Sequence, residues 1–235
     1  MLALTSLSPD PERREAQQEA IQSWRAAGLT PQTLNHFSEC AVLAHDYDLD
    51  IIMSARTAME QCGKHCMPIN ALLARLATTA GQSVLLNSDL VLRTSPAQFA
   101  RFAAQCVDGL GYLVKYNHTG DEAQAVREPY GIDAFVFDPS GISLGEAHLS
   151  LGQPVWDYWL PYEFMRLNKP LYTTDEPIAL HRRHPQTWDM ARWDDFAVEF
   201  CRVYQLDSPT AVDRLALFRG IHAALNRAQR LQVLA

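Results

Sequence analysis

Apolar residues are grouped along this chain in two ways, as short continuous runs and as positions spaced for one face of a helix. Short apolar runs predict buried strands. We expect such strands at residues 1–7, 83–86, 112–114 and 134–137, and shorter ones at 33–35 and 51–53. The acidic stretch 46–50 is expected to be a loop, and the polar stretch 117–129 is predicted to be a mobile loop.

Helical spacing marks the other segments. Apolar residues recur every three or four positions in stretches that begin at Ala16, Ile69, Phe99, Trp156, Trp193 and Ala211. The first of these helices also has start and stop signals, since Asp10 can cap it, Pro11 suits its first turn and Gly28 can end it.

The alternation of strands and helices predicts an α/β fold. We find no repeat, no low-complexity segment and no linker, so we expect one domain over residues 1–235. Within it, residues 1–188 would form the core, and residues 189–235 would be a helical extension used in packing or assembly. A homo-oligomer is left open.

Composition narrows the class of protein. Hydrophobic residues make up 48% and charged residues 20%, as in globular proteins. The net charge of −7 argues against nucleic acid as a partner, because binding to phosphates needs clustered Lys and Arg. No apolar run approaches the roughly 20 residues of a membrane span. Because the amino terminus does not resemble a signal peptide, a cytoplasmic protein is expected.

The chain has five cysteines, which we expect to be reduced thiols. Cys62 and Cys66 flank Gly-Lys-His and invite a zinc interpretation. A structural zinc site needs four ligands, and no second pair of cysteines or histidines with suitable spacing follows. We therefore rank zinc low.

One polar triplet, Asn87-Ser88-Asp89, interrupts an otherwise apolar stretch. A buried Asp89 without a partner would cost several kcal/mol, so a partner is expected. A metal ion at the carboxyl end of a strand is one solution. A turn in which Asp89 accepts hydrogen bonds from backbone amides is the other. The local sequence does not separate them.

The triplet resembles the Asp-x-Asp signature of the GT-A nucleotide-diphospho-sugar transferases, in particular glycosyltransferases of the bacterial family-2 type. The resemblance implies a Rossmann-like mixed sheet flanked by helices, and a divalent cation, Mn²⁺ or Mg²⁺, held by Asp89 against the diphosphate of the donor. This chain has Asn87 at the first position, which can bind the donor ribose or offer a neutral oxygen but supplies no charge.

The resemblance extends to the donor-binding segments upstream. Thr5 and Ser8 lie in and after the first strand, where these proteins receive the nucleoside, and Arg13 or Arg14 would follow. Lys64 and Asn70 flank the start of a predicted helix, where charge and backbone amides favour an anion. For Arg13 or Arg14, the alternative is an arginine that is simply exposed to solvent on a helix. For the segment with Lys64, the alternative is a solvated loop, with Pro68 in the first turn of the helix.

Downstream, Asp157 lies near the start of a predicted helix between two tryptophans. Inverting members of the family have an acidic residue at a comparable helix start, which removes the proton of the acceptor hydroxyl. A cap of the helix is the alternative. Asp133 lies in Gly-Ile-Asp-Ala-Phe-Val-Phe, which resembles a segment of bacterial glycosyltransferase-like proteins, and would contact the acceptor or the sugar.

A final cluster contains His181, Arg182, Arg183 and His184. In the family a histidine near the end of the core completes the metal shell, so His181 and His184 are candidate ligands beside Asp89. Arg182 would neutralise the leaving diphosphate. A lone histidine is more often structural, but here two histidines and two arginines follow the acidic motifs in the expected order.

Together these segments predict a metal-assisted glycosyltransferase that moves a sugar from a nucleotide-sugar donor to the hydroxyl of an unknown glycan or small-molecule acceptor. The first alternative is a non-catalytic nucleotide-binding or assembly module of the same fold. A sugar-phosphate nucleotidyltransferase ranks lower, because the loop after the first strand has none of the glycines usual in that class.

Overall fold

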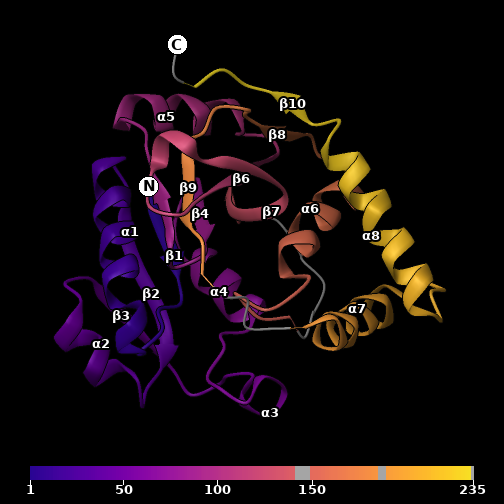
Figure 1. The fold of residues 1–235 in the computed structure, drawn as a ribbon, viewed down its shortest axis with the longest axis horizontal. Helices are drawn as coiled ribbons and strands as arrows, with labels where there is room; N and C mark the ends of the chain where they lie inside the picture. Colours follow the sequence, from indigo (N-terminus) through magenta and orange to yellow (C-terminus); the bar gives the residue numbers. More distant parts are fainter. Residues whose placement is uncertain (141–148, 185–188, 234–235) are drawn as a thin grey trace.

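A computed structural model describes residues 1–140, 149–184 and 189–233 (Figure 1). Its described residues form one sheet of ten strands with helices on both faces. The strands are β1 (Leu2–Thr5), β2 (Thr30–His36), β3 (Asp50–Ser54), β4 (Ser83–Leu86), β5 (Leu90–Leu92), β6 (Leu110–His118), β7 (Val126–Phe137), β8 (Leu171–Thr173), β9 (Ala179–Arg182) and β10 (Gln229–Arg230). The expected mixed sheet flanked by helices is confirmed.

One half of the sheet is parallel. Its strands lie in the order β3-β2-β1-β4, and each pairs in parallel with its neighbours. The chain adds β2 and β3 on one side of β1 and then crosses to add β4 on the other side. Open α/β sheets bind ligands outside the carboxyl ends of the strands where the order reverses. This topology therefore directs attention to the segments after β1 and β4.

The other half is built around an antiparallel hairpin. Strand β7 pairs with β4 and with β6, while β9 lies between β6 and β5. The register places His181 of β9 opposite both Asn117 of β6 and Leu90 of β5. Leu90 follows Asp89 directly, so the sheet itself brings residues from three distant parts of the sequence together.

Helices cover the two faces in separate groups. Their bounds are α1 (Arg14–Ala26), α2 (Cys40–Asp46), α3 (Met59–Cys62), α4 (Ile69–Leu76), α5 (Pro96–Gln105), α6 (Trp156–Arg166), α7 (Met190–Tyr204) and α8 (Ala211–Leu225). Alternate strand residues enter two apolar clusters. Val84 belongs to the cluster that includes residues of α1 and α5, and Leu85 belongs to the cluster that includes residues of α4, α6, α7 and α8. Because successive side chains of a strand point to opposite faces of the sheet, both faces are buried.

The carboxyl-terminal helices belong to the larger of these clusters. Phe200 of α7 and Phe218 of α8 are buried with Trp159 of α6. Strand β10 then pairs with β8 at the edge of the sheet. In Figure 1 these helices lie beside α6, on the opposite side of the sheet from α1. The segment predicted as an extension therefore contributes to the main core.

Two local predictions were wrong. The polar stretch 117–129 is strand at both of its ends, because β6 continues to His118 and β7 begins at Val126. The extra residues pair with each other at the twisted end of the hairpin, where partial exposure allows polar side chains. Helix α2 was not predicted, since only Leu43 of its residues is buried and no periodic signal arises.

Among the described residues, none of the helices has both the length and the apolar composition that a bilayer crossing requires.

Candidate active site

A large cleft of about 1270 Å³ opens where the sheet changes its order. Its walls include the segment after β1, with Ser6 to Asp10, and the triplet Asn87 to Asp89 after β4. Asp133, Asp157 and both candidate histidines also line it. Residues that lie far apart in the sequence are therefore parts of one cavity.

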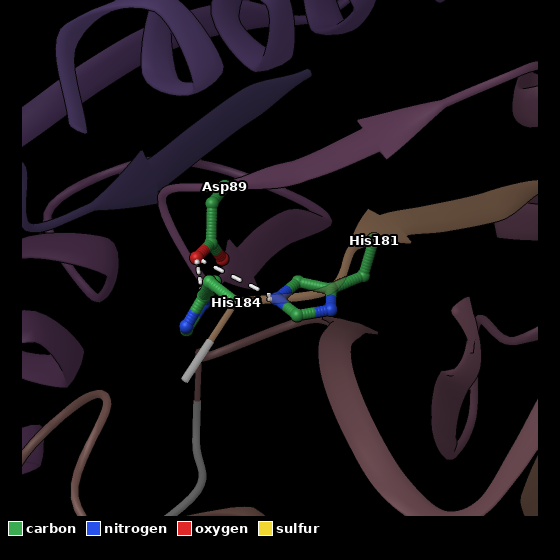
Figure 2. A group of neighbouring side chains, drawn as sticks. All are labelled: Asp89, His181 and His184. Carbon is green, nitrogen blue, oxygen red and sulfur yellow. Dashed lines mark hydrogen bonds and ion pairs between the residues drawn. The ribbon is translucent and has the colours of Figure 1, made fainter. Parts of the chain in front are cut away.

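Three possible metal ligands converge at one end of the cleft (Figure 2). Asp89 Oδ2 lies 3.1 Å from His184 Nε2 and 3.7 Å from His181 Nε2. The two Nε2 atoms are 3.2 Å apart. Asp89 comes from the turn after β4, and His181 and His184 come from β9 and the residues after it. We call this group the metal-end triad.

The orientation of His181 is set by the neighbouring strand. Its Nδ1 lies 2.8 Å from Asn117 Oδ1, and Asn117 Nδ2 in turn donates to Glu128 Oε2 at 3.4 Å. Because the amide oxygen can only accept, His181 Nδ1 carries the proton. Nε2 is then the ring atom that faces Asp89, where it can donate to the carboxylate when protonated or bind a cation when it is not. Such outer hydrogen bonds fix the tautomer of metal-binding histidines.

The donor set fits a divalent cation. A carboxylate with two imidazoles suits first-row divalent ions, whereas Mg²⁺ prefers oxygen ligands, and in an octahedral shell neighbouring ligands lie about 3 Å apart. Two of the three separations in the triad, 3.1 and 3.2 Å, are close to this value, and the third is 3.7 Å. Three ligands leave the remaining positions for water and substrate oxygens.

Basic side chains gather around Asp89. Burial acts to raise the pKa of Asp89, but hydrogen bonds and charge from His181 and His184 outweigh it and hold this pKa far below its usual range. Arg13 Nη1 lies 3.8 Å from Asp89 Oδ2. Asp89 is thus a carboxylate at any physiological pH, and this end of the cleft suits an anionic group.

A second acidic cluster lines the same cleft. Asp157 lies in the first turn of α6 and lines the cleft beside Asp133 and Lys115. Lys115 Nζ is 3.0 Å from Asp133 Oδ2. Burial, together with the negative charge of Asp133, raises the pKa of Asp157 to about 7. A carboxyl group with this pKa is suited to accept a proton near neutral pH.

The position of Lys115 depends on irregular pairing. The β6–β7 ladder shifts its register on both sides of Val114, and such bulges redirect side chains. Gly131 on β7 leaves the necessary space, since a Cβ there would lie 2.6 Å from Lys115 Cε. Burial lowers the pKa of Lys115, but the adjacent Asp133 more than compensates and raises it above its usual value. Lys115 therefore stays charged beside both aspartates.

The turn before α6 contains a strained residue. Val155 has φ 74°, in the left-handed region that β-branched residues rarely adopt, and it is buried. The backbone amides of Asp157 and Tyr158 donate to the Asp157 carboxylate. Strain of this kind costs about 1–3 kcal/mol and is concentrated at functional sites. Here the strained residue is the N-cap of α6, two residues before Asp157.

The segment after β1 is held rigidly. The Leu7 amide donates to Thr33 Oγ1 at 3.0 Å, and Asn35 Nδ2 donates to the Leu7 carbonyl at 2.8 Å. Gln17 bonds both the amide and the carbonyl of Ser8. These bonds leave Ser6 to Ser8 as a preformed wall between β2 and β4.

Most, but not all, of the predicted site residues line this cleft. Ser8, Arg13, Lys64, Asn87, Asp89, Asp133, Asp157, His181 and His184 do so. Thr5 is fully buried beneath the segment after β1, and Asn70 lies in α4; neither lines the cleft. Arg182 is exposed on β9, and its neighbour Arg183 lines the cleft instead. Arg14 bonds Asp46, away from Asp89.

Several lining residues were not singled out from the sequence. Lys115 and Asn117 lie on β6, in and next to a stretch expected to be loop. Trp193 and Arg219 come from α7 and α8, which were assigned to the extension. A lysine just before a polar stretch was the only signal for the first pair. No sequence signal connects the second pair to the cleft.

Comparisons with known proteins identify no family. No protein-family model matches the chain, and no curated protein matches it significantly. Among solved structures, a protein of Desulfovibrio desulfuricans described as a nucleotide-diphospho-sugar transferase aligns over 95% of this chain and 97% of its own, with 11% identity and a TM-score of 0.40.

Two further structures match a smaller part. Mannose-1-phosphate geranyltransferase of Thermus thermophilus aligns with 59% of this chain and 57% of its own, at 9% identity and a TM-score of 0.38. A protein of Bacillus anthracis described as a glucose-1-phosphate thymidylyltransferase, in complex with sucrose, aligns with 59% of this chain and 71% of its own, at 7% identity and a TM-score of 0.37. None of these similarities is close enough to assign an activity.

Proposed function

We propose that this protein is a metal-assisted glycosyltransferase that uses a nucleoside-diphosphate sugar as donor. The observation that carries the proposal is the pairing of two unlike carboxylates in one cleft. Asp89 lies among basic side chains, whereas Asp157 lies beside a second carboxylate and has a pKa of about 7.

The proposed donor position follows from the sheet. The nucleoside would lie against the rigid segment Ser6–Ser8 after β1, with its diphosphate directed toward Asp89 after β4. Arg13 and Lys64 line the same region and would add positive charge around the diphosphate. Asn87 would offer a neutral contact to the ribose.

The metal-end triad would hold the cation. When bound, a divalent cation supplies positive charge to the nucleoside diphosphate as it leaves. Asp89, His181 and His184 would bind it, and Asn117 would keep His181 in the tautomer with Nε2 available.

Asp157 would accept the proton of the acceptor hydroxyl as that oxygen attacks the sugar carbon. Lys115 and Asp133 on the neighbouring strands surround this carboxylate. Trp193 of α7 and Phe218 of α8 line the same cleft and offer apolar surface on which a sugar ring or another acceptor could rest. An inverting transfer needs such a base, so the position of Asp157 favours inversion.

This arrangement favours transfer to a hydroxyl over nucleotidyl transfer. A sugar phosphate attacking a nucleoside triphosphate is already ionised and needs no base with a pKa near 7. The charge of Asp133 disfavours ionisation of Asp157, and a purely structural module would gain nothing from such an acidic pair.

The test is a product assay. Purified protein is incubated with Mn²⁺, a panel of nucleotide sugars and a panel of hydroxyl acceptors, and the released nucleotide is identified. Nucleoside diphosphate release that requires both metal and acceptor supports the proposal. Release of pyrophosphate from a nucleoside triphosphate and a sugar phosphate would instead indicate a nucleotidyltransferase. Binding without turnover across the panels would indicate a module that lost catalysis.

A further inference from the structure

Cys62 and Cys66 lie at the end of α3 and in the loop that follows it, and neither has a role in the proposed transfer. Cys62 ends α3, and Cys66 follows after three intervening residues as a buried residue that lines the cleft. The two remain free thiols in the structure. Cys62 is partly exposed, so small reagents can reach it from solvent.

The backbone closes this segment into a compact loop. The Cys62 amide donates to the Ala58 carbonyl at 2.7 Å, and the Ala58 amide donates to the Cys66 carbonyl at 2.9 Å. The backbone of Ala58 is therefore hydrogen-bonded to the backbone of both cysteines. Gly63, at φ 69°, makes the reversal between them possible. This fixes the two thiols as neighbours.

The two sulfur atoms also differ chemically. The Cys66 thiol donates a hydrogen bond to Cys62, and, despite partial burial, this bond with the positive charges of Arg192 and Lys64 lowers the pKa of Cys62 to about 7. The same hydrogen bond, with burial, raises the pKa of Cys66. One thiol is thus a nucleophile at neutral pH, and its neighbour is held protonated.

A metal role for the pair has little support. Among the described residues, the only group with three ligands close enough to hold an ion is Asp89, His181 and His184. The nearby His65 Nδ1 is hydrogen-bonded to Thr57 and its ring stacks on His36. An adjacent pair of unlike thiols without further ligands is the arrangement of a dithiol that exchanges with disulfides.

We propose that Cys62 and Cys66 form a reversible disulfide by exchange with low-molecular-weight disulfides, and that this modification reshapes the wall of the cleft. The proposal depends on the loop and its two thiols, and it stands whether or not the protein transfers a sugar.

The exchange proceeds in two balanced steps. The Cys62 thiolate attacks one sulfur of the small disulfide, a mixed disulfide forms at Cys62, and one small thiolate leaves. Cys66 then gives up its proton to solvent and attacks the Cys62 sulfur, and the second small thiolate leaves. Two protein thiols are oxidised, and one small disulfide is reduced to two thiols.

The disulfide would affect the cleft because the cysteine loop is joined to the turn before α6. The Leu151 amide donates to the Met67 carbonyl at 3.1 Å, and the Ile69 amide donates to the Leu149 carbonyl at 2.9 Å. Residues 149–151 lead directly to the strained turn at Val155. Lys64, which lies between the cysteines, also lines the cleft.

The experiment measures thiols in the full-length protein at neutral pH. Reduced protein is treated with oxidised glutathione, and free thiols and adducts are located by mass spectrometry. We expect two of the five thiols to be lost together as a Cys62–Cys66 disulfide and to return on reduction. In Cys66→Ser we expect one glutathione to stay on Cys62, attached about tenfold or more faster than on Cys40.

Two variants act as controls. Cys62→Ser removes the attacking thiol and should leave Cys66 unmodified, while Cys40→Ser should form the disulfide as the native chain does. The proposal is overturned if Cys62 and Cys66 stay reduced in the native protein, or if Cys66→Ser shows adducts at Cys40 and Cys62 at equal rates. Stoichiometric zinc that protects both thiols would equally overturn it.

Discussion

Two parts of the cleft treat a carboxylate in opposite ways: the surroundings of Asp89, called the metal end, and the surroundings of Asp157 at the start of α6, called the α6 end. At the metal end, two imidazoles and Arg13 surround Asp89 and favour its charged form. At the α6 end, Asp133 and burial disfavour the charged form of Asp157, and Lys115 only partly compensates. The side chains have the same chemistry, and only their surroundings differ.

This difference teaches how one cavity can perform two tasks. A carboxylate that stays ionised is suited to hold a cation, and one with a pKa of about 7 is suited to exchange a proton. The fold produces the contrast by drawing the surroundings of Asp89 from the segments after β4 and β9, and those of Asp157 from β6, β7 and α6; β6 contributes to both, through Asn117 and Lys115. Each of the following variants is directed at one of the two carboxylates.

The largest effect is expected for Asp157→Asn. Loss of a general base lowers the turnover number about 10²–10⁴-fold, whereas metal and donor affinity at the other end should stay within about twofold. Steady-state kinetics with the best donor and acceptor measures both quantities. Asp195→Asn, on the exposed side of α7, is the matched control. A loss of donor affinity with an unchanged turnover number would mean that Asp157 binds the donor and does not accept a proton.

The next effect is expected for Asn117→Ala at the metal end. Without its hydrogen bond to Nδ1, His181 is free to adopt the other tautomer, and Mn²⁺ affinity should fall about 10–100-fold. Calorimetric titration with Mn²⁺ measures the affinity, and Asn226→Ala at the end of α8 is the control. An unchanged affinity would mean that Asn117 does not orient the ligand.

A smaller effect should appear in the pH profile. Because Asp157 must be ionised to accept a proton and has a pKa of about 7, the rate should rise about tenfold per pH unit below 7 and become constant above it. Lys115→Met removes a positive charge that favours ionisation, so the midpoint should move to higher pH. Rates measured from pH 5.5 to about 9 give the midpoint. A profile that is flat below 7 would remove Asp157 from the proton transfer.

The smallest effect concerns stability. The pKa of Asp157 is raised from 3.8 to about 7 on folding, so the folded state binds more protons in that window, and stability falls as pH rises through it. The side chain at this position in Asp157→Asn does not titrate, so the variant does not lose unfolding free energy as the pH rises. It should match the native chain near pH 4 and exceed its unfolding free energy by about 1–2 kcal/mol at pH 8, since partial exposure reduces the full effect. Urea unfolding at the two pH values tests this, and an equal difference at both would contradict it.

The sequence predicted the metal end better than the α6 end. Asp89 interrupts an apolar stretch at the end of a strand, and parallel strands end at one edge, so a shared site with a later histidine cluster could be inferred. The register that places His181 opposite Asn117 could not be inferred from the sequence, because pairing between β6 and β9 joins segments that are far apart in the chain.

Lys115 and the strained Val155 were beyond the reach of sequence patterns. A β-bulge directs Lys115 into the cleft, and Gly131 on the partner strand leaves room for it. The only signal in the sequence, a lysine just before a polar stretch, shows neither feature. Thr5 and Asn70 show the opposite error: both lie beside segments that line the cleft, but their own positions do not line it. A motif locates a segment, and the backbone decides which side chains of that segment reach the site.

The most direct test of the central claim is metal-dependent binding of nucleotide at Asp89. Thermal unfolding is followed with a panel of nucleoside diphosphates, with and without Mn²⁺, for the native chain, for Asp89→Ala, and for Asp48→Ala, a fully exposed control. At about 100 times the dissociation constant, at least one nucleotide should raise the melting temperature by roughly 5 °C, only with Mn²⁺. Asp89→Ala should lose this shift and Asp48→Ala should keep it. A panel without any shift, or an equal shift in Asp89→Ala, would contradict the proposed site.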